Sequence, residues 1–305
     1  MTDNNYRPTL AQLRAFVAVA EYRHFGTAAN HMGVSQPTLS QSLAALEAGL
    51  GVQLIERSTR RVLVTPAGQS LMQKALLTLE AADRFVAAAT GAGSGMVGAL
   101  RIGMIPTVAP YVLPKALPAI RERFPDLLPH LVEDQTVRLL EALRAGLLDV
   151  AVMALPADAV GMAEIPLYDE EFVLVLPAEH PLAGQDELSA QVLHELPLLL
   201  LDEGHCLRDQ TLDLCRLVNA SPLLGDTRAT SLATVVQCVA GGLGATLVPE
   251  SAVAVETSSG ALSTARFAKP APGRVIGLVY RTSSGREDDF TLLAELLRDQ
   301  APVES

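Results

Sequence analysis

The chain has 305 residues, of which 49% are hydrophobic and 19% are charged, and it carries a formal net charge of −11. This length predicts about two domains, and the composition excludes a disordered chain because it can bury substantial cores. Three cysteines exclude a disulfide-rich scaffold. The overall acidity, taken alone, argues against a nucleic-acid-binding protein, because phosphate contacts require lysine and arginine.

The sequence contains no evident signal for export or membrane insertion. The first residues, MTDNNYRPTLAQ, have neither the cationic nor the apolar region of a signal peptide. One uncharged stretch, 229–249, has the length of a membrane span, but Ser, Thr, Gln and Gly residues interrupt it. We interpret it as a buried helix, a turn and a strand, and we expect a soluble, cytoplasmic protein with no membrane partner.

The charge is distributed unevenly along the chain. Residues 1–92 contain 8 Lys/Arg and 6 Asp/Glu, whereas residues 93–305 contain 15 Lys/Arg and 28 Asp/Glu. The glycine-rich segment GAGSGMVGA at 91–99 separates the two parts and predicts a flexible linker. The acidity therefore belongs to the C-terminal part, and the mildly basic N-terminal part remains a candidate for binding DNA.

Three helices are predicted at the N-terminus. Apolar periodicity indicates helices over about 9–22 and 27–32, and Gly33 ends the second. Ser35 is a plausible N-cap for a third helix, with Pro37 in its first turn. The apolar stripe of that helix consists of Leu39, Leu43, Leu46 and Leu50. A short helix, a glycine turn and a helix that begins with small polar residues predict a helix-turn-helix, with a plain three-helix core as the alternative.

Polar residues near the start of the third helix lie off this stripe and could reach base edges in the major groove, where glutamine can bond adenine bidentately. Two short strands, predicted at 52–55 and 62–65, flank the segment RSTRR. Its arginines suit contacts to phosphate or the minor groove, which favours a wing over a solvated turn. The candidate DNA-binding residues are Gln36, Pro37, Thr38, Ser40, Gln41, Arg57, Arg60 and Arg61.

A long helix is predicted next, with Thr65 as its cap and Pro66 at its first position. Apolar residues alternate at spacings of three and four over more than two heptads, which favours pairing with a second helix. Packing against the core of the same chain is the alternative. Two-fold pairing also suits a protein that reads two DNA half-sites. The predicted dimerisation residues are Met72, Ala75, Leu79, Ala82 and Val86.

The N-terminal part resembles the DNA-binding domain of LysR-type transcriptional regulators. The similarity rests on AA at 28–29, SQPTLSQ at 35–41, LE at 46–47, LI at 54–55, Arg57 and TPAG at 65–68. The resemblance implies a winged helix-turn-helix in residues 1–66, a long linker helix and hinge in 67–98, and a regulatory domain in 99–305. It further implies that this regulatory domain has two lobes, like a periplasmic binding protein, and that copies assemble as dimers or tetramers.

Residues 99–305 alternate predicted strands with helices, which indicates α/β lobes with largely parallel sheets. Ligands in such lobes bind at the carboxyl ends of strands, beside helix N-termini. Thr107 follows the first strand, and Cys206 follows the strand at 197–201. The strands are predicted at 100–105, 130–133, 150–154, 172–176, 198–201, 245–248 and 275–280, and a final helix at 288–298.

Cys206 has a setting that favours its thiolate. His205 precedes it, Arg208 follows two residues later, and a helix could begin at this point. Cys215 lies nine residues downstream. In a continuous helix the two would be about 13 Å apart, whereas a disulfide needs Cα atoms within about 7 Å. Their pairing would therefore require the segment to unwind, as in a redox-controlled two-state element.

Two other interpretations of these cysteines remain open from the residues alone. Both could be buried and act as small hydrophobic side chains. Zinc binding by His194, His205, Cys206 and Cys215 is a weaker possibility, because no CxxC or compact Cys/His pair is present. Cys238 has an apolar setting typical of a structural residue. We therefore predict no metal and no cofactor.

The C-terminal part resembles the hydrogen-peroxide-sensing branch of the LysR-type family. The similarity rests on GHCLRDQ at 204–210 with a second cysteine at 215, IPTVAPYVLP at 105–114 and IGLVYR at 276–281. The resemblance implies that Cys206 is the peroxidatic cysteine and Cys215 the resolving one. It also implies that peroxide is bound or its reaction supported by Thr107, Thr136, His205, Arg208, Gln210 and Arg274.

The function implied is that of a DNA-binding regulator, not an enzyme, that senses hydrogen peroxide and controls oxidative-stress genes. Its expected partners are double-stranded promoter DNA, further copies of itself, RNA polymerase and cellular thiol reductants. One alternative is a LysR-type regulator that senses a small metabolite in the cleft between the lobes. A thiol peroxidase is a second alternative, but such an enzyme has no use for the N-terminal domain.

Overall fold

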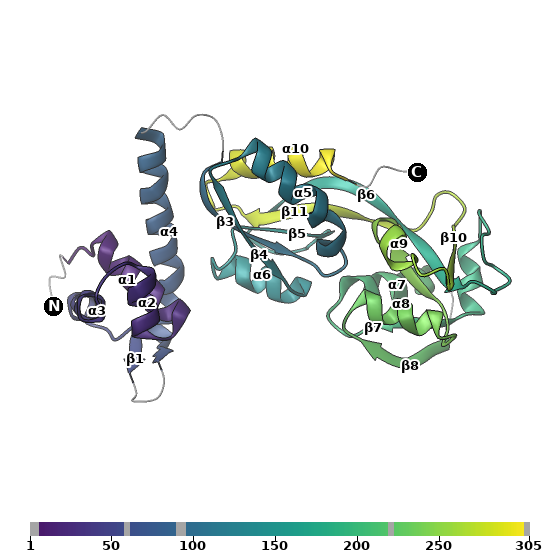
Figure 1. The fold of residues 1–305 in the computed structure, drawn as a ribbon, viewed down its shortest axis with the longest axis horizontal. Helices are drawn as coiled ribbons and strands as arrows, with labels where there is room; N and C mark the ends of the chain where they lie inside the picture. Colours follow the sequence, from purple (N-terminus) through teal and green to yellow (C-terminus); the bar gives the residue numbers. More distant parts are fainter. Residues whose placement is uncertain (1–5, 58–61, 90–95, 219–222, 302–305) are drawn as a thin grey trace. The chain divides into compact units, whose positions relative to one another are not determined.

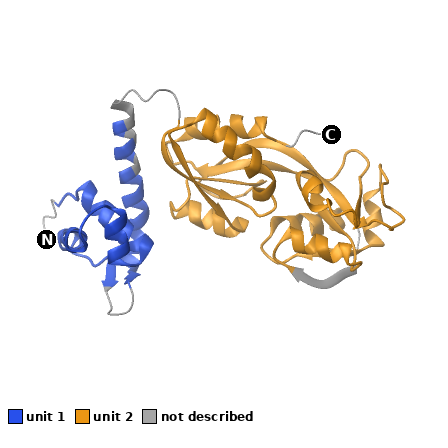
Figure 2. Cartoon of the chain, viewed as in Figure 1, with its two compact units in different colours: residues 1–94 blue, residues 95–305 orange. Residues whose placement is uncertain are grey.

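The structure, a computed structural model, describes residues 6–57, 62–89, 96–218 and 223–301 (Figure 1). The chain divides into two compact units, residues 1–94 and 95–305 (Figure 2). Each unit has a hydrophobic core of its own. No helix in the described part of the chain combines the length and the apolar character that a membrane span requires.

The first unit contains three short helices, a hairpin and one long helix. Thr9 and Gln12 form a capping box at the first helix, and Ser35 caps the third, with Pro37 in its first turn as predicted. The second helix begins two residues earlier than predicted, because the His24 ring caps it by accepting from the Thr27 N–H. The elements are α1 (Leu10–Tyr22), α2 (Phe25–His31), α3 (Gln36–Leu50), β1 (Ile55–Arg57), β2 (Val62–Val64) and α4 (Pro66–Ala89).

The hairpin β1–β2 is antiparallel, with Ile55 opposite Val64. Its first strand begins at Ile55, and not at residue 52 as predicted. The reason lies in α3, where one carboxylate oxygen of Glu47 accepts from the N–H groups of Leu54 and Ile55 at 2.8 and 2.9 Å. The hairpin is thereby attached directly to the third helix.

Helix α4 packs along the core of its own unit. Ala75 is buried there, and Met72 and Leu79 are half-buried against it. Ala82 is also half-buried, while Val86 is 58% exposed. The N-terminal half of the predicted heptad stripe thus contacts the same chain, and the role of the stripe in dimerisation stays a prediction.

The second unit consists of two lobes joined by long strands (Figure 1). The first lobe has one core, formed around the central strands, and the second has two adjoining cores. The first lobe comprises β3 (Gly98–Met104), α5 (Ala109–Arg123), β4 (Leu127–Glu133), α6 (Thr136–Arg144), β5 (Val150–Leu155), the first part of β6 (Met162–Pro177), β11 (Gly273–Arg281) and α10 (Glu287–Asp299). The second lobe comprises the end of β6, the 3-10 helix η1 (Ala190–His194), β7 (Pro197–Leu201), α7 (Cys206–Leu217), β8 (Leu223–Ala229), α8 (Leu232–Ala240), β9 (Thr246–Pro249), α9 (Glu250–Glu256) and β10 (Leu262–Ala265).

The largest sheet is mixed, with the strand order β10-β6-β11-β5-β3-β4 and β9 paired with β6. Strand β3 runs parallel to β4 and β5, and β7 runs parallel to β8. The prediction of largely parallel sheets is nevertheless wrong here, since β11 is antiparallel to β5 and β6, and β6 is antiparallel to β9 and β10. The chain leaves the first lobe along β6 and returns along β11, so these strands must run in opposite directions.

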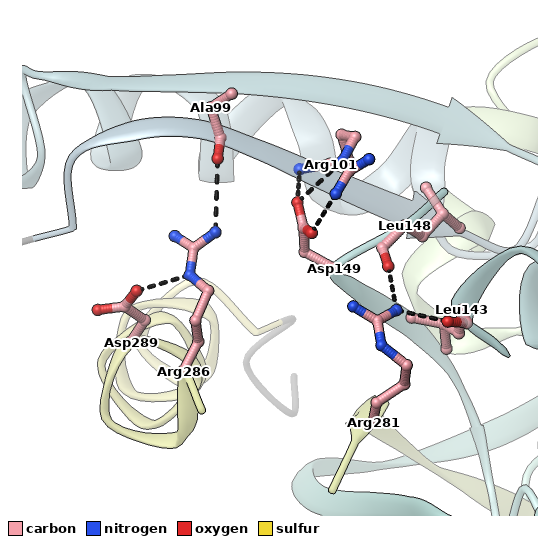
Figure 3. Close-up of polar contacts among 8 residues, drawn as sticks. All are labelled: Ala99, Arg101, Leu143, Leu148, Asp149, Arg281, Arg286 and Asp289. Atoms are coloured by element: carbon pink, nitrogen blue, oxygen red, sulfur yellow. Dashed lines mark hydrogen bonds and ion pairs between the residues drawn. The ribbon is translucent and has the colours of Figure 1, made fainter. Parts of the chain in front are cut away.

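Three arginines, Arg101, Arg281 and Arg286, form polar contacts that join elements of the first lobe (Figure 3). Arg101 forms an ion pair at 2.7 Å with the buried carboxylate of Asp149. Arg286, just before α10, donates to the backbone carbonyl of Ala99 at 3.4 Å. Arg281 donates to two backbone carbonyls at and just after the end of α6. These contacts join β3 to the start of β5 and to the residue that caps α10, and they join the end of β11 to the segment around the end of α6.

Candidate functional site

The N-terminal end of α3 presents the polar face that the sequence predicts. Gln36, Pro37, Thr38 and Gln41 are exposed, and Ser40 is half-buried. In the apolar stripe of the same helix, Leu39, Leu43 and Leu46 are buried and Leu50 is half-buried. Arg57 lies in β1, but its side chain, like residues 60 and 61, falls outside the described part of the structure. The geometry of the helix is therefore that of a recognition helix, and the contribution of the wing arginines stays a prediction.

The two cysteines singled out by the sequence lie on one continuous helix, α7. Cys206 is its first residue, with His205 as the N-cap, and Cys215 lies in its last turn. All three cysteines of the chain are free thiols. The helical rise of 1.5 Å per residue separates Cys206 from Cys215 by about 13 Å along the axis. A disulfide between them therefore requires α7 to unwind, as the spacing predicts.

Cys206 lies where the two lobes meet. Its side chain packs against the core of the first lobe, whereas the next residue, Leu207, packs into the core of the second. Cys215 is 2% exposed in the other core of the second lobe, and burial raises the pKa of its thiol. Cys238 is half-buried on α8 against the second lobe. Of the three cysteines, Cys206 alone is positioned to respond to a change at the lobe junction.

A narrow pocket lies beside Cys206, and in this structure its walls leave no room for a molecule the size of water. A ligand can therefore enter only if the surrounding side chains move apart, and a drug-sized ligand, whose pocket measures roughly 300–1,000 Å³, does not fit. The hydroxyl oxygen of Thr136 is buried and has no hydrogen-bond partner in the structure. It is therefore available to a ligand. The pocket is lined by Ile105, Pro106, Thr107, Gln135, Thr136, Gly204, His205 and Cys206.

Arg274 positions the second hydroxyl of this pocket. Its Nη1 donates to the Thr107 Oγ1 at 2.8 Å, and its Nη2 donates to the Thr107 carbonyl at 3.0 Å. A guanidinium can only donate, so the Thr107 oxygen must accept and its own hydroxyl proton points elsewhere. Since Thr107 lines the pocket, this proton is available to a bound molecule.

Arg274 is itself held by a carboxylate. Glu170 Oε2 lies 2.9 Å from the Arg274 Nε and 2.8 Å from its Nη2. The two side chains are 2% and 1% exposed, so the ion pair is completely desolvated. Nothing in the sequence singles out Glu170, because it is the middle of three consecutive acidic residues, 169–171.

His205 is buried, and burial lowers the pKa of its imidazole below its ordinary value, although nearby Asp202 and Glu133 oppose this shift. The ring is therefore neutral at pH 7. Arg208 donates to the Leu201 carbonyl at 3.2 Å, at the end of β7. Cys206 itself lies at the N-terminus of α7, where the helix dipole has its positive end.

Comparison with known proteins identifies both units. Residues 10–69 match the bacterial regulatory helix-turn-helix proteins of the lysR family, and residues 93–302 match the LysR substrate binding domain. The chain belongs to the LysR family of transcriptional regulators. Together the two matches cover most of this LysR-type regulator, so the helix-turn-helix interpretation of α2 and α3 is confirmed.

Relatives similar over nearly the whole chain place this LysR-type regulator in the OxyR branch of the family. It is 59% identical over 297 residues to a probable hydrogen peroxide-inducible genes activator of Mycobacterium avium, covering 97% of this chain and 96% of the relative. It is 41% identical to the DNA-binding transcriptional dual regulator OxyR of Escherichia coli K12, covering 95% and 94% of the two chains.

Solved structures of OxyR proteins share the fold of this regulator. A hydrogen-peroxide-bound cysteine mutant of Corynebacterium glutamicum OxyR is 54% identical, with a TM-score of 0.69, and covers 97% of this chain and 93% of its own. A full-length OxyR mutant from Pseudomonas aeruginosa is 34% identical, with a TM-score of 0.79, and each chain is covered to 96%. The two-lobed regulatory domain predicted from the sequence is thereby confirmed.

Some of the predicted peroxide-site residues of this LysR-type regulator line the pocket, and the others lie outside its lining. Thr107, Thr136, His205 and Cys206 line the pocket. Arg274 reaches it through Thr107. The Gln210 side-chain oxygen is buried and unpartnered, but neither Gln210 nor Arg208 is among the lining residues. Their roles stay predictions.

Gln135 is a lining residue that the sequence reasoning missed. Its Nε2 donates to the Glu203 carbonyl at 3.1 Å, which links the first lobe to the loop before Cys206. The neighbouring Gly204 has φ +93°, and a methyl group there would lie 2.6 Å from the Gln135 side-chain oxygen. Its position in the sequence could have predicted this role, because Gln135 follows the carboxyl end of β4 and ligands of α/β lobes bind at such ends.

Proposed function

We propose that this LysR-type regulator senses hydrogen peroxide in the cytoplasm by oxidation of Cys206 and a disulfide with Cys215, and thereby controls peroxide-defence genes. The observation that carries the proposal is the pocket beside Cys206, which is small and offers two buried threonine hydroxyls. The narrow pocket leaves no room beside Cys206 for a larger metabolite. Similarity to hydrogen peroxide-inducible activators supports the same conclusion.

The first chemical step is a nucleophilic displacement. The Cys206 thiolate attacks one peroxide oxygen, the O–O bond breaks, and a sulfenic acid forms while the other oxygen leaves as hydroxide. The N-terminus of α7 stabilises the thiolate. The hydroxyls of Thr107 and Thr136 donate to the departing oxygen, where negative charge develops. The hydroxide takes up the proton that the thiol released, with the neutral His205 as a relay, and becomes water.

The second step forms the disulfide. The Cys215 thiol attacks the sulfenic sulfur, the S–S bond forms, and the sulfenic oxygen leaves as water. Because α7 must unwind for this step, the contacts of Cys206 and Leu207 with the two lobe cores must change. We propose that a homodimer or homotetramer transmits this change to promoter DNA and RNA polymerase. Cellular thiol reductants would restore the dithiol.

Replacing Cys215 with serine should stop the reaction after its first step. This variant keeps the pocket and Cys206, and it removes only the resolving thiol. We expect peroxide to produce a sulfenic acid on Cys206 that a dimedone-type reagent traps, as located by peptide mass spectrometry. Cys238→Ser is the matched control and should still form the disulfide. Finding only free thiol at Cys206 after peroxide would count against Cys215 as the resolving residue.

The DNA-reading role is tested by Gln36→Ala, which removes an exposed amide at the start of α3. We expect binding to a duplex selected from a random pool to weaken by about 1–3 kcal/mol, because one bidentate base contact is lost. Binding to an unrelated duplex should not change. Gln191→Ala, an exposed position in the second unit, serves as the control. Equal weakening on both duplexes, measured by gel shift, would show that Gln36 does not read bases.

A further inference from the structure

We infer that Glu170 is a positioning residue of the peroxide reaction, which acts through Arg274 to orient the Thr107 hydroxyl. The inference rests on the proposed function and adds a residue to it. Glu170 lies on β6 and Arg274 lies on β11, directly opposite each other in the strand register. Thr107 follows β3, which is separated from β11 by β5 in the same sheet. Three segments far apart in the chain therefore meet at one buried contact.

The geometry fixes the guanidinium in one orientation. A single oxygen of Glu170, Oε2, accepts a hydrogen bond from the Arg274 Nε at 2.9 Å and forms an ion pair with its Nη2 at 2.8 Å. The guanidinium is a planar fork, so two fixed nitrogens determine the direction of the third. That third nitrogen, Nη1, is the one that donates to the Thr107 Oγ1. The direction of the Thr107 hydroxyl proton therefore depends on the Glu170 carboxylate.

The carboxylate is held at its other oxygen as well. Glu170 Oε1 accepts from the backbone N–H of Ser251 at 3.2 Å, near the start of α9. Glu170 thus connects a helix of the second lobe to the pocket wall in the first. Both oxygens and the charge are used, so an amide at this position could not reproduce all the contacts. It would put an NH₂ group where one of the two acceptors is needed.

The inference predicts a selective loss of reactivity toward peroxide. In Glu170→Gln we expect the rate of Cys206 sulfenic acid formation to fall about tenfold to a hundredfold, because the donor on the leaving oxygen is misaligned. Alkylation of Cys206 by iodoacetamide should be unchanged, since it leaves no oxygen for Thr107 to stabilise. A merely structural defect would alter both rates together.

A double-mutant cycle tests whether Glu170 acts through Thr107. Thr107→Val should slow peroxide oxidation by itself, and Glu170→Gln should add nothing in that background. Glu171→Gln is the matched control, because the adjacent Glu171 pairs with Lys269 at the surface and lies away from the pocket. Peptide mass spectrometry assigns each rate to Cys206.

The outcomes separate this inference from the function on which it rests. If the wild-type Cys206 fails to react with peroxide, the proposed function is wrong. If the wild type reacts and Glu170→Gln reacts equally fast, or if its effect multiplies with that of Thr107→Val, the inference is overturned. Glu170→Asp keeps the charge but shortens the arm, so it should oxidise more slowly while alkylating normally. If Glu170→Gln does not fold, Glu170→Asp becomes the variant that tests the role of Glu170.

Discussion

Cys206→Ser is expected to abolish peroxide-induced disulfide formation. Of the three cysteines, Cys206 alone lines the pocket, at the N-terminus of α7. A serine hydroxyl there is not ionised at neutral pH and cannot attack peroxide at a useful rate. Cys215 should not replace it, because burial raises the pKa of its thiol and keeps it protonated. Thiol counting before and after stoichiometric peroxide should show two thiols lost in the wild type and none in the variant.

The same samples distinguish the rival functions when they are applied to DNA. A peroxide sensor should change its gel-shift pattern after oxidation in the wild type but not in Cys206→Ser. A metabolite sensor would change its gel shift with its metabolite, and not with peroxide, in both proteins. A thiol peroxidase would consume peroxide continuously in the presence of a reductant. A disulfide that still forms in Cys206→Ser, for example between Cys215 and Cys238, would refute the assignment of the peroxidatic cysteine.

The first unit could be predicted closely because local signals determine it. The Ser35 cap, Pro37 and the leucine stripe of α3 all lie within one helix, and each acts over three or four residues. The start of β1 was missed because it depends on Glu47, a side chain of another element. Spacing alone also could not decide whether α4 pairs with a second copy or packs against the core of its own chain, since the same apolar stripe suits both.

The site in the second unit was harder to predict than the first unit, because it is built from contacts between segments that are far apart in the chain. Arg274 and Thr107 are 167 residues apart, and Arg274 and Glu170 are 104 apart. No periodicity or spacing connects them, and family resemblance supplied Arg274 without its partner. The sequence also gives no indication that His205 is buried, and this burial lowers the pKa of its imidazole. Pairing across β6 and β11 and burial together create the site.

Arg274→Met should have the largest effect on stability of any change near the pocket. The substitution removes a guanidinium that is 1% exposed and leaves Glu170 as an unpaired buried carboxylate. Breaking such a pair by removing one partner costs about 3–5 kcal/mol. We expect a loss of this size in the free energy of urea-induced unfolding, and slower oxidation of Cys206, because Thr107 loses both hydrogen bonds from Arg274.

The double variant Arg274→Met with Glu170→Met separates these two effects. It removes both charges, so most of the lost stability should return, as it does when buried ion pairs are replaced by apolar side chains of similar volume. The oxidation rate should stay low, because no donor then orients the Thr107 hydroxyl. If the rate recovered together with stability, the ion pair would serve only the fold, and the orientation of Thr107 would have to come from elsewhere. Recovery of stability alone would show that the buried pair is retained for its effect on Cys206.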